Sequence, residues 1–187
     1  MLNSPIAEIE FPMLRLMLLR HAKSDWSRPG MPDRNRPLNA RGREAAPLMA
    51  AHMLANDLVP QRALVSVATR TRETWKLITP FLHRKVETIF EARLYESSPH
   101  AILAVIKETP ATVKSLLLVG HNPGLQTLGL ALIGSGDGQA RDNLAAKFPT
   151  AALAVIDFIV GPWSALRPST GRLERFIRPR DLSGGSD

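Results

Sequence analysis

Two histidines, each at the end of an apolar run, are the residues of this chain best placed to do chemistry. His21 follows Arg20 directly after the first run, and His121 stands at the end of a similar run one hundred residues later. Neutral imidazole can act as a base or as a nucleophile. Because His21 lies between Arg20 and Lys23 and shortly before Ser24, its surroundings favour an anion.

Arginines of a third segment could join the two histidines. An apolar run that ends near Ser66 continues into a polar turn with Arg70 and Arg72, where a helix is expected to begin. Backbone N–H groups at a helix N-terminus already favour anions. If all three runs are parallel strands, two histidines and two or three arginines meet at one sheet edge. That constellation suits a phosphoryl group and a nucleophile that carries it covalently.

Simpler interpretations apply to each piece taken alone. A histidine at a strand end is usually a solvated loop residue, Glu96 reads as an ordinary loop carboxylate, and residues 120–124 could form only a tight turn. The coincidence of several such pieces, in order and all at strand ends, favours a site. The remaining histidines have a spacing that fits no metal site; they are His52, His83 and His100.

Apolar runs alternate with helical patterns along the chain, which predicts an α/β fold with a parallel or mixed sheet covered by helices. The expected strands cover 14–19, 63–67, 86–90, 115–119, 151–160 and 172–177. The first expected helix begins after Asn39, and four more are expected over 71–83, 99–108, 125–133 and 140–147. Ser98 and Asn39 are candidate N-caps, and Pro47 is expected to bend the first helix. Segments 25–37 and 134–138 are expected to be loops.

The length of 187 residues suits one domain, expected over 13–181. Residues 1–12 read as a flexible extension, with Met13 as an alternative start, and 182–187 as a disordered tail. No segment approaches the roughly 18 uninterrupted apolar residues of a membrane span, and the N-terminus lacks the pattern of a signal peptide. The chain has no cysteine, which excludes disulfides and thiolate sites. These features fit a cytoplasmic protein.

The net charge of +7 predicts an anionic partner, and much of the positive charge gathers around His21. Segment 20–43 holds seven cations and, before Pro37, only Asp25 and Asp33 as acids; the cations are Arg20, Lys23, Arg28, Arg34, Arg36, Arg41 and Arg43. A nucleic acid, a phosphoprotein, a small anion or an ordinary charged surface could each account for it. Because no nucleic-acid motif is present and aromatic residues make up only 5%, neither nucleic acid nor membrane is expected as a partner.

Four motifs in order resemble those of the histidine phosphatase superfamily, which includes the phosphoglycerate mutases. They are Leu-Arg-His-Ala-Lys-Ser (19–24), Ser-Val-Ala-Thr-Arg-Thr-Arg-Glu-Thr (66–74), Leu-Tyr-Glu (94–96) and Val-Gly-His-Asn-Pro-Gly (119–124). The short length, Pro-Leu-Asn-Ala-Arg-Gly-Arg (37–43) and Lys-Phe-Pro-Thr (147–150) are most similar to its SixA-like phosphohistidine phosphatase group. The resemblance spans nearly the whole chain and implies a phosphoglycerate mutase-like, three-layer α/β/α sandwich with a mostly parallel sheet.

The resemblance also implies roles for individual residues. His21 would be the nucleophile that becomes phosphohistidine, Glu96 the acid for the leaving group, and His121 the third catalytic residue. The phosphate oxygens would be held by Arg20, Arg70 and His121, with further hydrogen bonds from Ser24 and from around Asn122; the spacing from Ser66 selects Arg70 over Arg72. The arginines should lower the pKa of the nucleophile and neutralise phosphoryl charge, so no metal and no other cofactor is expected.

Segment lengths favour hydrolysis over mutase chemistry. A mutase must cover its site, whereas only 29 positions separate Arg70 from Pro99. An open, basic site would suit a phosphohistidine-bearing signalling or phosphotransfer protein. A phosphatase of small phosphomonoesters and a non-catalytic basic binding module are the alternatives, and the oligomeric state is left open.

Overall fold

One seven-stranded sheet forms the centre of the computed structural model of the chain, which describes residues 13–159 and 161–183. The strands are β1 (Met13–Arg20), β2 (Arg62–Ser66), β3 (Glu87–Glu91), β4 (Ser115–Gly120), β5 (Ile133–Gly136), β6 (Leu153–Ile159) and β7 (Gly171–Ile177). Their spatial order is β3-β2-β4-β1-β6-β7-β5. Only β6 runs antiparallel to its neighbours, so the predicted mostly parallel sheet is confirmed.

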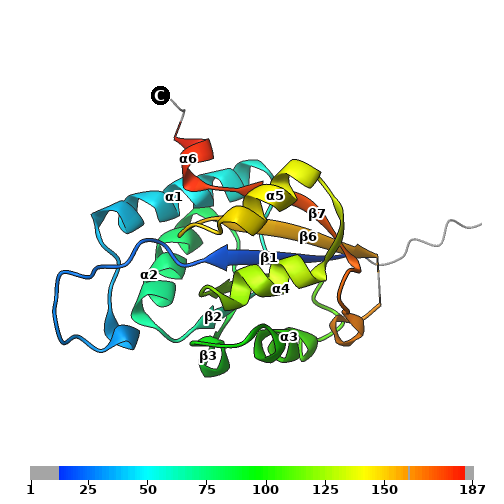
Figure 1. The fold of residues 1–187 in the computed structure, drawn as a ribbon, viewed down its shortest axis with the longest axis horizontal. Coiled ribbons are helices and arrows are strands. Elements are labelled where there is room, and N and C mark those ends of the chain that lie inside the picture. The colour runs from blue at the N-terminus through cyan, green and yellow to red at the C-terminus, as the bar shows by residue number, and fades with distance from the viewer. Residues whose placement is uncertain (1–12, 160, 184–187) are drawn as a thin grey trace, which may run out of the picture.

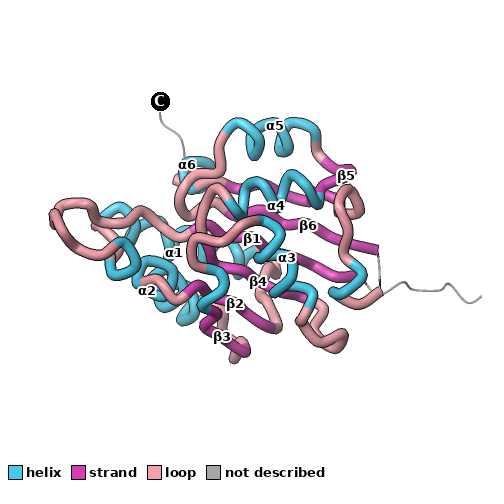
Figure 2. Tube along the Cα trace, turned by 60° about the horizontal axis from the view of Figure 1, so that its bottom comes forward, coloured by secondary structure: helices cyan, strands magenta, loops and turns pink. Residues whose placement is uncertain are grey.

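Helices cover both faces of the sheet and make three layers (Figures 1 and 2). The helices are α1 (Ala40–Ala55), α2 (Thr69–Ile78), α3 (Pro99–Lys107), α4 (Gly124–Leu132), α5 (Gly138–Ala146) and α6 (Pro179–Leu182). Side chains from α1, α2 and α6 pack against one face, and those from α3, α4 and α5 against the other. The predicted three-layer α/β/α sandwich is therefore confirmed.

Strand β1 illustrates why an uninterrupted apolar run is needed at the centre. Leu16 and Leu18 join the core under α3, α4 and α5, whereas Met17 and Leu19 join the core under α1 and α2. Successive side chains of a strand point to opposite faces, so a strand covered on both sides must be apolar at nearly every position. All four side chains are fully buried. This packing fixes the strand whose end carries His21.

Both predicted helix caps are present. The Asn39 side chain accepts a hydrogen bond from the backbone N–H of Gly42 at 2.9 Å, and the Ser98 hydroxyl accepts one from Ala101 at 3.2 Å. Such caps satisfy N–H groups that have no partner within the helix. Pro47 lies inside α1, which continues through it to Ala55.

Three segments differ from the prediction. Residues 134–138, expected to be a loop, begin with part of β5, which pairs with β7 at the sheet edge. Its glycines allow close backbone approach, because a Cβ at Gly136 would collide with the backbone of Leu173. The second helix, expected to reach residue 83, ends at Ile78. A 3₁₀ turn follows over Thr79–Phe81, because Pro80 cannot extend an α-helix.

The C-terminal boundary also differs, because Leu182, expected to start the tail, ends α6 and packs against the core. The expected extension 1–12 and the rest of the tail, 184–187, lie outside the described residues. None of the helices in the described part of the chain has the length and apolar character needed to span a membrane.

Candidate active site

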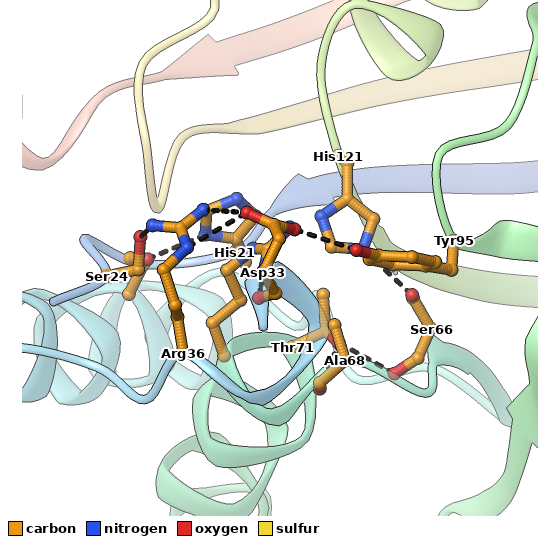
Figure 3. Close-up of polar contacts among 11 residues, drawn as sticks. His21, Ser24, Asp33, Arg36, Ser66, Ala68, Thr71, Tyr95 and His121 are labelled. Atoms are coloured by element: carbon orange, nitrogen blue, oxygen red, sulfur yellow. Dashed lines mark hydrogen bonds and ion pairs between the residues drawn. The ribbon is translucent and has the colours of Figure 1, made fainter. Parts of the chain in front are cut away.

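The pairing of β1 with β4 brings the two histidines together. The strands are adjacent and parallel, with Arg20 opposite Gly120, so the residues that follow leave the same edge of the sheet. The backbone N–H of His21 donates to the Gly120 carbonyl at 3.1 Å. The imidazole centroids of His21 and His121 lie 5.2 Å apart, and both rings are buried (Figure 3).

His21 is held in the form that a nucleophile requires. Its Nδ1 lies 2.8 Å from the Ala22 carbonyl oxygen, which can only accept, so Nδ1 carries the proton and Nε2 has the free lone pair. Burial lowers the pKa of His21 to about 3; the Ala22 hydrogen bond opposes this, and nearby His121, Arg70 and Arg20 lower the pKa further. The ring is therefore neutral at pH 7.

His121 is bound on one side and unpaired on the other. Its Nε2 lies 2.8 Å from the Ser66 hydroxyl, at the end of β2, and its buried Nδ1 has no hydrogen-bond partner within the described structure. When Ser66 donates to Nε2, Nδ1 carries the ring hydrogen and is an unused donor. Burial, with Arg70 next in importance, lowers the pKa of His121 to about 4.

Two arginines complete the group of unpaired donors. Arg70, 5% exposed, donates from Nη1 to the Asp33 carbonyl at 2.7 Å and from Nη2 to Asp33 Oδ2 at 2.9 Å. Arg20 donates from Nη1 to the Phe148 carbonyl at 2.7 Å. The Nε of each arginine is buried and has no partner among the described residues. Buried N–H groups are normally hydrogen-bonded, so these donors are open to an acceptor.

Arg72, the alternative to Arg70, points elsewhere. Its side chain is exposed, and the guanidinium lies 4.9 Å from the centre of the Phe90 ring. The first turn of α2 therefore places one arginine in the site and the other outside it.

Asp33 is a site residue that sequence reasoning missed. Its carboxylate accepts hydrogen bonds from Arg70, from Arg36 and from the Tyr95 hydroxyl, the last at 2.8 Å (Figure 3). Burial raises the pKa of Asp33, but the hydrogen bonds from Arg36, Tyr95 and Arg70 outweigh it and hold the pKa well below its usual range. Asp33 is therefore ionised and ties the loop after β1 to α2. The one available signal was an acid within a strongly basic segment.

Two further residues expected to bind phosphate already have partners. The Ser24 hydroxyl is buried and accepts from Arg36 at 2.9 Å. The Asn122 amide donates to Gln126 at 3.1 Å and to the Phe148 carbonyl at 3.2 Å, while its Oδ1 is buried without a described partner. Both residues border the site, and Asn122 precedes a cis bond to Pro123.

Glu96 is not joined to the imidazoles. Its side chain is exposed, its backbone is left-handed with φ of 50°, and it forms no hydrogen bond with another described residue. The preceding Tyr95 lies against the site instead, with its ring 5.6 Å from that of His121 and edge-on to it. Of the predicted residues, the structure thus gathers Arg20, His21, Ser24, Arg70, His121 and Asn122, and leaves Glu96 at the surface.

Within 13–159 and 161–183, no three side chains of His, Asp or Glu gather as metal ligands would. The fold and the site together define the class of protein: a mostly parallel sheet carries two buried imidazoles and two arginines at the carboxyl ends of its strands. The sequence profile of the histidine phosphatase superfamily (branch 1) matches residues 16–102.

Relatives extend this match over most of the chain. A crystal structure assigned to the phosphohistidine phosphatase SixA from Agrobacterium tumefaciens is 30% identical, with a TM-score of 0.76 over 89% of this chain and 98% of that one. A second structure with the same assignment, from Nakamurella multipartitia, is 26% identical, with a TM-score of 0.76 over 89% of this chain and 96% of that one. An uncharacterised protein of Mycobacterium leprae is 33% identical over 87% of this chain and all of its own length. The chain belongs to the histidine phosphatase superfamily.

Proposed function

We propose that this protein is a phosphohistidine phosphatase that works through a covalent intermediate on His21. One observation carries the proposal: the buried Nε–H groups of Arg20 and Arg70 and the buried Nδ1 of His121 have no described partner, and they lie in one site with a neutral imidazole whose Nε2 is free. A phosphoryl group has the oxygens that such donors need and an electrophilic phosphorus for the imidazole.

The first step forms a bond between His21 Nε2 and phosphorus and breaks the bond between phosphorus and the substrate nitrogen. The electron pair of the broken bond stays on the substrate ring. If that ring carries a proton on its other nitrogen, it leaves as neutral imidazole and needs no further proton. The oxygen of a water molecule then bonds to the phosphorus, and the bond between phosphorus and His21 Nε2 breaks, with its electron pair returning to the ring. The phosphate leaves with the protons of that water. Arg20 and Arg70 offset the charge on the transferring oxygens in both steps.

The position of Glu96 supports a nitrogen-linked substrate. An alkoxide leaving group requires a proton from a positioned acid, whereas an imidazole does not. Glu96 is exposed and forms no hydrogen bond with another described residue. Asp33, the carboxyl group that does lie in the site, is ionised and therefore has no proton to give. The likeness to SixA structures points to the same substrate class.

Trapping tests the covalent step. Brief incubation with a radiolabelled phosphohistidine protein should leave acid-labile, alkali-stable label on the chain, and His21→Ala should remove it. His100→Ala, which changes an exposed histidine on α3, is the matched control and should retain the label. A chain that hydrolyses neither substrate class nor takes up label would be a binding module.

Comparison of two leaving groups tests the substrate class. We expect a higher kcat/KM for a phosphohistidine protein than for p-nitrophenyl phosphate and alkyl phosphates. Glu96→Gln should change phosphohistidine hydrolysis less than twofold, because the leaving imidazole needs no acid. Should Glu96→Gln slow alkyl phosphate hydrolysis strongly and the alkyl phosphates be the better substrates, the protein would be a phosphomonoesterase.

A further inference from the structure

A groove of about 560 Å³ opens beside the site, between α1, α5 and α6. In Figure 1 these three helices lie together along one side of the molecule. The groove is lined in part by Lys23, two residues after His21, and by Pro149 and Thr150. The next residue, Ala151, donates its backbone N–H to the His21 carbonyl at 3.1 Å. The groove therefore adjoins the backbone that holds the nucleophile.

Positive charge dominates the lining. The cationic side chains are Lys23, Arg41, Lys147, Arg178 and Arg180, and the one carboxylate in the lining is Glu44. Arg178 is held by Asp181 at 2.9 Å. Lys23, Arg41 and Lys147 are exposed and form no ion pair with another described residue. Their charge remains available to a partner.

Apolar groups share the lining. Leu48, 42% exposed, is one of the large apolar side chains that α1 leaves in solvent, and Ala45, Ala146 and Pro149 lie around the same groove. An inorganic phosphate has no use for such a surface. A polypeptide with apolar side chains among its carboxylates could bury them there.

We propose that this groove binds an acidic, partly apolar segment of the phosphoprotein substrate while its phosphohistidine enters the site. The proposal rests on the proposed function and adds a docking surface to it. Charge complementarity selects the occupant, because unpaired cations raise the encounter rate and the preference for an acidic partner. Nucleic acid is the less suitable occupant, since the lining holds no aromatic side chain on which bases could stack.

Designed peptides test the inference. Three phosphohistidine peptides have the same length and differ in the residues that flank the phosphohistidine. The acidic peptide has Asp, Glu and Leu there, the neutral peptide has Gln and Leu, and the basic peptide has Lys and Leu. The test variant is Arg41→Glu with Lys147→Glu, and the matched control is Arg84→Glu with Lys85→Glu. The control residues are also exposed cations but lie outside the groove, just before the edge strand β3.

We expect kcat/KM for the acidic peptide to exceed that for the neutral one about tenfold at low salt, and the gap to close near 0.5 M NaCl. The groove variant should lose this preference and the control should keep it, while both hydrolyse a small phosphoramidate at the wild-type rate. The unphosphorylated acidic peptide should bind wild type more tightly than the groove variant.

Equal turnover of the three peptides by the wild type would overturn the inference, as would a preference that survives in the groove variant. Equal competition by a single-stranded oligonucleotide would also overturn it. So would a tenfold higher kcat/KM for the acidic peptide in a chain that ends at Ser183 than in the full chain, which would assign the groove to the chain's own last residues. A protein that hydrolyses no phosphoramidate would contradict the proposed function alone, since the peptide-binding measurement does not depend on turnover.

Discussion

Arg70 has five N–H donors, and its contacts with Asp33 divide them into two groups. Asp33 takes one hydrogen from each Nη, at the end of the guanidinium. The Nε–H and the other hydrogen of Nη2 lie along one side edge, where two parallel bonds to an anion can form. The Nε is buried and unpaired in the described structure. Asp33 thus holds Arg70 by its end and leaves its side edge open to an anion.

Asp33→Asn should separate binding from catalysis. The amide retains the size of the carboxylate but lowers the negative charge near the site by one, so the inhibition constant for tungstate should not rise. The weaker hold on Arg70 should lower kcat about tenfold, the equivalent of ~1.4 kcal/mol. Steady-state kinetics on a phosphohistidine protein, with tungstate as inhibitor, provide both values.

Glu87→Gln is the control for this change. Glu87 also accepts hydrogen bonds from one arginine, three from Arg62, but in an exposed pair on strands β2 and β3 away from the site. Its kcat should match wild type, because exposed ion pairs contribute little. The positioning role would be contradicted if Asp33→Asn had the kcat of the wild type. It would also be contradicted if the inhibition constant for tungstate rose while kcat stayed the same.

The site residues whose positions could be predicted are those that stand at the end of a predicted strand. His21 and His121 end apolar runs, and parallel pairing brings strand ends together whatever else the chain does. Asp33 could not be found this way. It lies 37 positions from Arg70, and their contact depends on how the intervening loop and helix fold. For Glu96 the motif implied a role, and the structure shows an exposed side chain on a left-handed backbone; its role as an acid stays a prediction.

At the scale of elements, the start of α1 supports the segment that carries His21. The backbone of Gly42 packs so closely on Lys23 that an added Cβ would collide with the Lys23 carbonyl. The Asn39 N–H also donates to that carbonyl at 3.0 Å. The position of His21 therefore depends on backbone contacts with the start of α1.

Gly42→Ala should force α1 and the 21–24 segment apart. Overpacking of this kind costs about 1–3 kcal/mol, so we expect a lower melting temperature and a fall in kcat/KM that exceeds the loss of folded protein. Thermal unfolding and phosphohistidine hydrolysis at 20 °C measure the two effects. Gly138→Ala, at a helical position with open space around the new Cβ, is the control and should lower neither the melting temperature nor kcat/KM. Unaltered kinetics in Gly42→Ala would show that α1 does not position His21.

Local sequence signals located most elements, and the exceptions have a physical cause. Asn39, Ser98 and Pro99 mark helix starts because their effects are confined to one turn. β5 was missed because its strand character comes from β7, to which its glycines lie close, and not from an alternation of its own. Elements stabilised mainly by a distant partner are the ones that a local pattern does not reveal.

At the scale of the whole molecule, folding lowers the pKa of two imidazoles, those of His21 and His121. Burial is the main cause, and the neighbouring guanidiniums add to it, so the pKa of His21 falls to about 3 and that of His121 to about 4. In the unfolded chain both return to about 6.5. Below that pH the unfolded chain binds protons that the folded chain does not, and acid must therefore favour unfolding.

His21→Gln measures this linkage. The stabilisation from a neutral His21 is complete above pH 6.5 and is lost progressively as the pH falls toward about 3. Within this window each such imidazole lowers the free energy of unfolding by up to about 1.4 kcal/mol per pH unit. Urea unfolding of wild type between pH 6.5 and 4.5, a range above the titration of Asp33, should therefore show a steeper decline than that of His21→Gln. Equal slopes for the two proteins would mean that folding does not depress the pKa of His21.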